Sequence, residues 1–281
     1  MTLSKAANGV TKPDHRASAG GGRLGLDLQR FAHDQLTMAQ AHLARPGDDR
    51  HDGVHEARKC LRRTRAVLAM GTKPWRKSLV AVDLELRRIC RGLSWVRDAQ
   101  ALVESLARLE GNPAITADIH ARSLVAATRR RDEVLAHALQ RDADFARRRR
   151  RIANVDARLA SLDWSTVDTH AALAALRRSE RRLRRSRHKA MAKPDDDARW
   201  HTFRRRLRRW RQQITVLDAI APETTRGLDS RDAQAVLMGE LQDDSLLLAR
   251  CAGRSPFPSD CRAAIRQISR HRLSRRSAMA E

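Results

Sequence analysis

Two stretches of this 281-residue sequence repeat one spacing of histidine and arginine. Residues 55–65 and 201–211 align without gaps, and both read H-x-x-R-x-x-L-R-R-x-R. The planar guanidinium group of arginine can donate two parallel hydrogen bonds to a phosphate or a carboxylate. A histidine beside it can donate to the same anion and gain a proton there. The repeated spacing therefore indicates a site for anions that carry phosphate or carboxylate groups.

On an α-helix, the basic residues of each stretch share one face, because successive residues are 100° apart. We call these faces the first and second basic ridges. Their candidate binding residues are His55, Arg58, Lys59, Arg62, Arg63 and Arg65 in the first ridge, and His201, Arg204, Arg205, Arg208, Arg209 and Arg211 in the second. One basic helix face alone is usually solvated surface. Like charges at i, i+4 destabilise a helix by roughly a few tenths of a kcal/mol per pair, so a ridge that occurs twice favours a ligand that neutralises it.

The elements that carry the ridges are predicted to be helices. Apolar residues recur at spacings of three and four from Leu24 onward, with breaks at Gly and Pro. The predicted helices cover about residues 24–44, 51–70, 75–93, 98–109, 114–140, 142–161, 165–192, 197–220, 230–252 and 259–272. The scarce aromatics Trp200, Phe203 and Trp210 fall opposite the second ridge, so we expect them in a core. No alternating strand pattern of useful length occurs, and the fold class is all-α.

Composition narrows the function. The chain has 57 Lys and Arg against 33 Asp and Glu, a net charge of +24, which points to a polyanionic partner. Hydrophobic residues at 41% are enough for a buried core. Aromatics at 3%, without tyrosine, argue against modules that stack single-stranded bases on exposed rings.

Other sequence features bear on localisation and on the thiols. No apolar run approaches the roughly 18 to 20 residues that span a bilayer, and no secretory signal opens the chain, so we expect a cytoplasmic protein without membrane insertion. Residues 1–23, rich in Gly, Ser, Ala and Lys, are predicted to be a disordered tail. The four cysteines lack zinc-site and disulfide-scaffold spacing and are predicted to be buried free thiols.

Several motifs together resemble the CHAD domain family, an α-helical family named for its histidines. They are Val54-His55-x-x-Arg58 with Arg62, Arg63 and Arg65, the Arg97-Asp98 pair, and His201-x-x-Arg204 with Arg208 and Arg211. The resemblance covers about residues 24–273. It departs at Lys59, where an apolar residue is common, and at Gln242, which replaces the arginine of the Arg-Asp pair. The ExExK signature of the triphosphate-tunnel enzymes often fused to this domain is absent, so the chain looks like a stand-alone member.

The resemblance implies a fold and a function. The fold is two antiparallel helical bundles related by pseudo-twofold symmetry, with the ridges facing one another around a central basic groove. It implies one domain over residues 24–275, with halves of about 24–162 and 163–275. The implied function is non-catalytic binding of inorganic polyphosphate without a cofactor, with sulfate or phosphate ions able to occupy the site in a crystal. The family also suggests association with polyphosphate or polyhydroxyalkanoate granules.

Three further constellations are less decisive. Arg177 and Arg181 begin another basic line, which either adds a wall to the groove or is solvated surface; both interpretations stay open. The Arg97-Asp98 pair reads as an ion pair that braces neighbouring helices. The His51-Asp52-x-x-His55 spacing is a poor metal site, because a third ligand is missing and the surrounding arginines repel a cation.

Two rival functions follow from the same charge. A net charge of +24 would also attract DNA, so a nucleic-acid-binding or compaction protein is the alternative. An enzyme that processes phosphate polymers is disfavoured, because the sequence has no GxxxxGK, GxSxG or HExxH motif and few carboxylates that could hold a metal beside the ridges. We therefore expect a protein that is not an enzyme. The sequence leaves its oligomeric state open.

Overall fold

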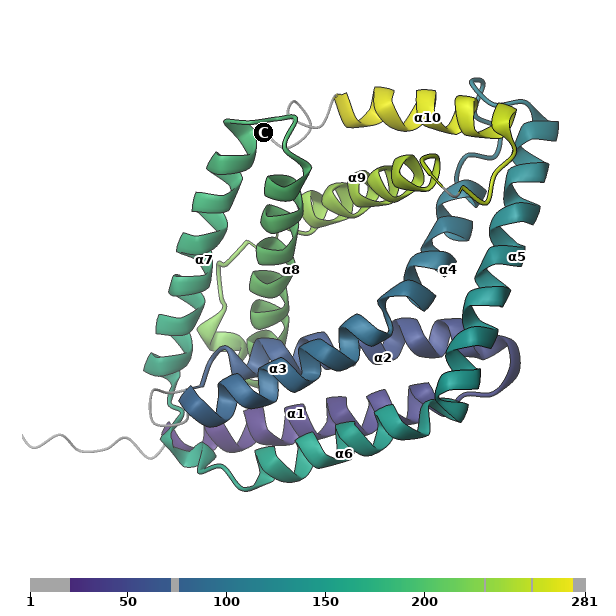
Figure 1. Cartoon of the computed structure of the whole chain (residues 1–281). Coiled ribbons are helices and arrows are strands. Elements are labelled where there is room, and N and C mark those ends of the chain that lie inside the picture. The colour runs from purple at the N-terminus through teal and green to yellow at the C-terminus, as the bar shows by residue number, and fades with distance from the viewer. Residues whose placement is uncertain (1–20, 72–75, 230, 254, 275–281) are drawn as a thin grey trace, which may run out of the picture.

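The computed structural model describes residues 21–71, 76–229, 231–253 and 255–274. These residues form ten α-helices and short 3₁₀ turns, with no strand among them (Figure 1). The helices are α1 (Gly21–Leu43), α2 (Arg50–Leu68), α3 (Arg76–Gly92), α4 (Ser94–Ala107), α5 (Ala117–Arg141), α6 (Ala146–Ala160), α7 (Thr169–Met191), α8 (Asp197–Ile220), α9 (Asp232–Arg250) and α10 (Ser259–Ser274). The all-α prediction is confirmed.

All ten predicted helices are present, with ends that differ from the predicted ones by no more than four residues. At the N-terminus, α1 begins at Gly21, so residues 21–23 are helical rather than part of a tail. The apolar stripe explains this, because Leu24 and Leu28 are already buried in the first turns. Residues 1–20, the rest of the predicted tail, lie outside the described residues.

Helix starts follow the capping chemistry of the sequence. Thr116, Asp168 and Asp196 each precede a helix, and each side chain accepts the backbone N–H three residues further on. Such caps satisfy amide groups that the first helical turn leaves unpaired. Asp196 caps α8, which carries the second basic ridge, so the acidic run at residues 195–197 belongs to a helix start.

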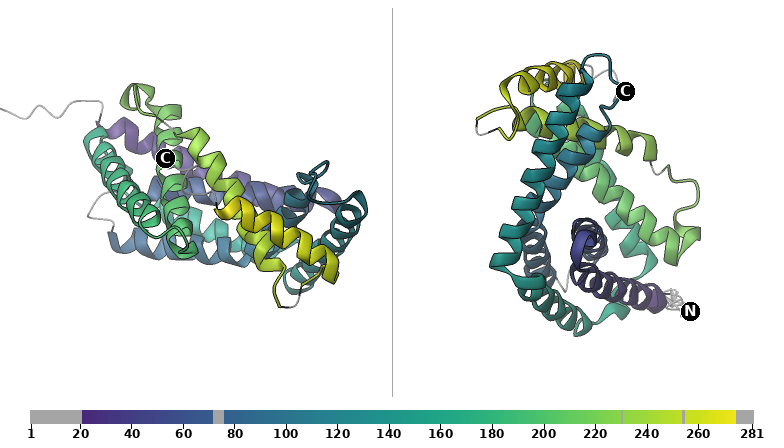
Figure 2. Two further views of the ribbon diagram at one scale, coloured as in Figure 1. Left: turned by 90° about the horizontal axis from the view of Figure 1, so that it is seen from above. Right: turned by 90° about the vertical axis from the view of Figure 1, so that its right-hand side faces the viewer.

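The helices pack mainly in neighbouring pairs. α1 packs on α2, α7 on α8, α4 on α5 and α9 on α10. The two ridge helices, α2 and α8, also pack on each other, and α4 packs on α9. α1 and α6 lie at one end of the molecule and α10 at the opposite end, with α5 running along one side between them (Figures 1 and 2).

Two hydrophobic cores hold these pairs together. The larger core contains residues of all ten helices, most of them from α1, α2, α3, α6, α7 and α8, and the smaller core joins α4, α5, α10 and the end of α9. Each core therefore contains helices from both sequence halves. Trp200, Phe203 and Trp210 are buried in the larger core, as predicted, which turns the opposite face of α8 away from it. The four cysteines are buried and free, as expected from their spacing.

Within the described part of the chain, no helix combines the length and the apolar character needed to cross a bilayer. The longest helix, α5, has 25 residues and carries charged side chains along its length.

Candidate functional site

The two basic ridges open onto one cavity of about 660 Å³. Ten of the fifteen described residues that line it are arginines, and none of the fifteen is acidic. The arginines are Arg58, Arg62 and Arg65 of α2, Arg87 and Arg91 of α3, Arg182 of α7, and Arg205, Arg206, Arg208 and Arg209 of α8. We call this space the arginine cavity. Four helices thus direct cations into one volume without a lining carboxylate to balance them.

Three partly buried arginines of the cavity have no bound partner among the described residues. Arg62, Arg208 and Arg209 form no hydrogen bond or ion pair with any residue that the structure describes. The Nε atom of Arg62 is fully buried and likewise has no acceptor within the described chain. Leaving a buried donor unsatisfied costs about 1–3 kcal/mol, and more for a charged group. An anion in the cavity would supply the missing acceptors.

The guanidinium groups of the two ridges also repel one another. Burial, followed by the nearby charges of Arg58 and Arg204, lowers the pKa of Arg62 to about 10. Burial is likewise the main cause that lowers the pKa of Arg208, and the charge of Arg62 is the next. Arginine stays protonated in proteins at pH 7, so both groups carry a charge. Because the field of α2 reaches α8 in this way, the two ridges lie close enough to act on one ligand.

Other ridge arginines are held in place by protein groups. Arg58 donates to the carbonyl oxygen of Cys90 and, at 2.9 Å, to the hydroxyl of Ser94. Arg65 makes a two-bond ion pair with Asp83 of α3, at 2.7 and 3.2 Å. These contacts fix the guanidinium groups at the wall of the arginine cavity and leave further donors on each of them, since arginine has five N–H groups.

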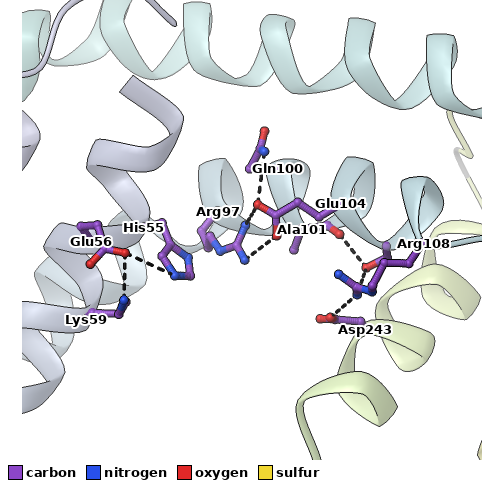
Figure 3. A network of polar contacts seen from close by, with 10 residues as sticks. His55, Glu56, Lys59, Arg97, Gln100, Ala101, Glu104, Arg108 and Asp243 are labelled. Atoms are coloured by element: carbon purple, nitrogen blue, oxygen red, sulfur yellow. Dashed lines mark hydrogen bonds and ion pairs between the residues drawn. The ribbon is translucent and has the colours of Figure 1, made fainter. Parts of the chain in front are cut away.

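The two histidines flank the arginine cavity instead of lining it. His55 lies beside Glu56, with 3.8 Å between Nε2 and Oε1, and Figure 3 shows its ring next to Arg97 of α4. Burial and then the charge of Arg97 lower the pKa of His55. His201 is exposed, and its Nδ1 is 3.0 Å from Oε1 of Gln242 on α9.

A second cavity, of about 500 Å³, adjoins the arginine cavity on the other side of α8. His201 and Arg204 line this second cavity. Thr202 and Arg205 line both cavities, so the second ridge lies between two adjoining cavities.

The family of the chain follows from its match to a family model. The model of the CHAD domain matches residues 30–252, which include both ridges and the arginine cavity. The chain belongs to the CHAD domain family. Comparisons with curated proteins and with solved structures gave no match.

Six of the fourteen candidate residues line the arginine cavity of this CHAD domain: Arg58, Arg62, Arg65, Arg205, Arg208 and Arg209. Two more, His201 and Arg204, line the second cavity. The remaining six line neither: His55, Lys59, Arg63, Arg211, Arg177 and Arg181.

Protein partners account for three of the candidates outside the cavities. Lys59 is bound to Glu56 at 2.9 Å, and Arg211 to Asp232. Arg63 turns towards α1, where it donates to Gln35 at 3.4 Å. For these residues the ridge pattern gave the correct helix, while the 100° step between neighbours turns the side chain to the edge of the face.

The basic line on α7 contributes a different residue from the ones expected. Arg177 and Arg181 are exposed to solvent and line neither cavity, whereas Arg182 lines the arginine cavity. Arg87 and Arg91 of α3 were also missed by sequence reasoning, although their spacing of four places them on one helix face. That spacing could have shown that Arg87 and Arg91 share a helix face. The sequence does not determine whether this face of α3 points towards the cavity or towards solvent.

The Arg97-Asp98 pair of the CHAD motif does not brace neighbouring helices, so this interpretation was wrong. Arg97 makes a two-bond ion pair with Glu104 of the same helix, at 2.8 and 2.7 Å (Figure 3). Asp98 forms no hydrogen bond or ion pair with a described residue. The seven-residue spacing of Arg97 and Glu104 returns to the same face of α4 after two turns, which favours the intrahelical pair.

Proposed function

We propose that this CHAD domain binds inorganic polyphosphate in the arginine cavity, between the two basic ridges. The observation that carries the proposal is the lining of the cavity, where ten arginines converge and no described lining residue is acidic. Like charges gathered in this way oppose folding, and a bound polyanion would relieve their repulsion. The family's known binding of polyphosphate supports the same ligand.

Polyphosphate fits the cavity chemically. Its chain carries about one negative charge per phosphate, and each unit offers oxygens that the fork of a guanidinium can bind in pairs. Because successive units are equivalent, the chain can meet arginines of α2, α3, α7 and α8 without a fixed register. Affinity should then rise with chain length and fall steeply with salt.

We further propose the arrangement that the family implies, two antiparallel bundles related by a pseudo-twofold axis. The pairing of α1 with α2 has its counterpart in α7 with α8, and that of α4 with α5 in α9 with α10. The equivalent ridge helices α2 and α8 pack on each other, which would place the axis beside the arginine cavity. A polymer of identical units suits a site with two equivalent walls.

We propose that the domain binds without catalysis. Phosphoryl transfer normally uses metal ions held by carboxylates beside the basic groups. No carboxylate is among the described residues that line the arginine cavity. Incubation of the protein and polyphosphate with Mg²⁺ or Mn²⁺ tests this, and the release of free phosphate would contradict it.

Calorimetric titration with long-chain polyphosphate tests the binding proposal. We expect Arg62→Ala/Arg208→Ala to bind roughly a hundredfold more weakly, since two charge-assisted contacts are lost. The control Arg129→Ala/Arg130→Ala removes two exposed arginines of α5, both paired with Glu133, and should stay within about threefold of the unchanged protein. Equal losses in both variants would mean that net charge, not the arginine cavity, determines binding.

Nucleic acid is the second candidate, because a charge of +24 would attract DNA to any fold. Competition separates the two candidates. Duplex DNA at equal phosphate concentration should not displace long-chain polyphosphate at moderate salt, and displacement would favour the nucleic-acid function.

We also propose that the protein associates with polyphosphate granules in the cytoplasm. Fluorescence microscopy with the Arg62→Ala/Arg208→Ala variant tests this, since the variant should leave the granules.

A further inference from the structure

Carboxylates gather on one side of the ridges, at helices α4 and α9. Glu104 of α4 is bound to Arg97, and Asp243 of α9 is bound to Arg108 at 2.6 Å (Figure 3). Asp98, also on α4, interacts electrostatically with Arg97 and with Arg250 of α9. We call Asp98, Glu104 and Asp243 the acidic set. The arginine cavity, on the side of α3 and α7, has no described acidic residue in its lining.

The charges of the acidic set reach the ridge arginines. Asp98 interacts electrostatically with Arg58 of the first ridge and Arg204 of the second. Asp243 also interacts with Arg204. Arg204 is therefore partly neutralised from the α4 and α9 side, whereas Arg62 and Arg208 have no carboxylate bound to them. The net positive charge of the site falls from the arginine cavity towards the acidic set.

No hydrogen bond or ion pair to a described residue fixes Asp98 in the fold. It is partly buried, and it forms no hydrogen bond or ion pair with a residue that the structure describes. Burial raises its pKa, which means that the ionised form is poorly stabilised there, even though the arginines around it act in the opposite direction. What this carboxylate supplies is a negative charge directed at guanidinium groups that would otherwise bind phosphate.

We propose that the acidic set ends the polyphosphate path. The chain binds the ridges from the side of α3 and α7 and is repelled at Asp98, Glu104 and Asp243, so the bound segment does not extend over Arg97 and Arg204. The inference rests on the proposed function and deepens it, because it gives the site a direction and a limited length. A limited footprint would let one long chain hold many copies of the protein.

The slope of log affinity against log salt measures how many phosphates the protein neutralises, at about 0.7 per contact for a single strand. In Asp98→Asn/Asp243→Asn, freed arginines should take up about two further phosphates of a long chain. The slope should steepen by about 1.4, and binding at 0.15 M salt should tighten about tenfold. Tripolyphosphate is short enough to stay inside the arginine cavity, so its slope should not change.

The matched control is Asp118→Asn/Asp260→Asn, which makes the same change in net charge. Asp118 of α5 and Asp260 of α10 both pair with Arg122 of α5. Neither aspartate lines the arginine cavity. We expect its salt slope to equal that of the unchanged protein. If the salt slope of Asp98→Asn/Asp243→Asn equalled that of the unchanged protein, or if this variant bound polyphosphate more weakly, the inference would be overturned. The proposed function would remain intact.

The single variant Asp98→Asn keeps the test decisive if the double variant unfolds, because it removes no hydrogen bond present in the described structure. Its slope should steepen by about 0.7 with long-chain polyphosphate. An unchanged slope in the folded single variant would contradict the inference. If the unchanged protein itself bound no polyphosphate, the proposed function would fail instead.

Discussion

The guanidinium group of Arg62 on α2 lowers the pKa of Arg208 on α8, second only to burial as a cause, and neither arginine is bound to a described residue. Arg65, one turn from Arg62 on the same helix, is instead neutralised by Asp83. The cavity therefore contains two kinds of arginine. Some are fixed by carboxylates or carbonyl groups, and others remain uncompensated until a ligand arrives.

Arg208→Met should stabilise the unliganded protein. The substitution removes a buried, repelling charge and leaves no partner unpaired, so the free energy of unfolding should rise by about 1 kcal/mol and Tm by about 2–4 °C. Affinity for polyphosphate should fall at the same time. Thermal unfolding followed by circular dichroism, together with calorimetric titration, measures both quantities.

Arg148→Met is the control of opposite sign. Arg148 is bound at 2.6 Å to the buried Asp142, so its loss leaves an uncompensated carboxylate and should cost about 3 kcal/mol. A fall in Tm for both variants would contradict the view that Arg208 is kept for binding at the expense of stability.

Polyphosphate should raise the thermal stability of the unchanged protein. A ligand at one hundred times its Kd stabilises the native state by about 2.7 kcal/mol, which corresponds to a rise in Tm of about 5–10 °C for a domain of this size. The rise should be smaller for Arg62→Ala/Arg208→Ala at the same ligand concentration. Equal shifts for both proteins would place the stabilising contact outside the arginine cavity.

Affinity should increase as the pH falls. The pKa of His55 lies below 6.5 in the free protein because of burial and of Arg97, and a bound polyanion would raise it. Binding then takes up a proton. Affinity therefore increases as the pH drops from the pKa of His55 in the complex towards its lower pKa in the free protein. Besides Arg97, the charged groups that act on this ring are Glu56, Lys59 and Arg62 of α2, and its charge also reaches Glu104 of α4.

The variant His55→Ala isolates the part of the pH dependence that comes from this ring. It should bind more weakly than the unchanged protein below pH 6.5 and show a flatter profile between pH 5 and 7. The raised pKa values of Asp98 and Asp243 act in the same direction at lower pH, so some dependence should persist there. An unchanged profile in this variant, measured by calorimetry at several pH values, would remove His55 from the mechanism.

The sequence predicted the helices well because the signals for each helix lie within its own residues. Apolar residues repeat at three and four, and Gly, Pro and capping residues mark the ends. The buried side of the second ridge helix, with Trp200 and Trp210, also follows from this periodicity. The same local pattern placed the six ridge arginines that line the cavity on the correct helix face.

Other parts of the site depend on how each helix is rotated relative to its neighbours. The sequence pattern of a single helix does not determine this rotation. Arg182 lines the cavity and its neighbour Arg181 does not, although the two are adjacent in one basic line. Arg97 forms its ion pair with Glu104, two turns away, and not with the adjacent Asp98. The lack of carboxylates in the cavity lining is likewise a property of the packing of α2, α3, α7 and α8.

The most direct measurement is a crystal structure with tripolyphosphate. We expect phosphate oxygens within hydrogen-bond distance of the guanidinium groups of Arg62 and Arg208, and none beside Asp98. Anions bound only at exposed arginines such as Arg129 and Arg130, with Arg62 and Arg208 free of phosphate, would contradict it.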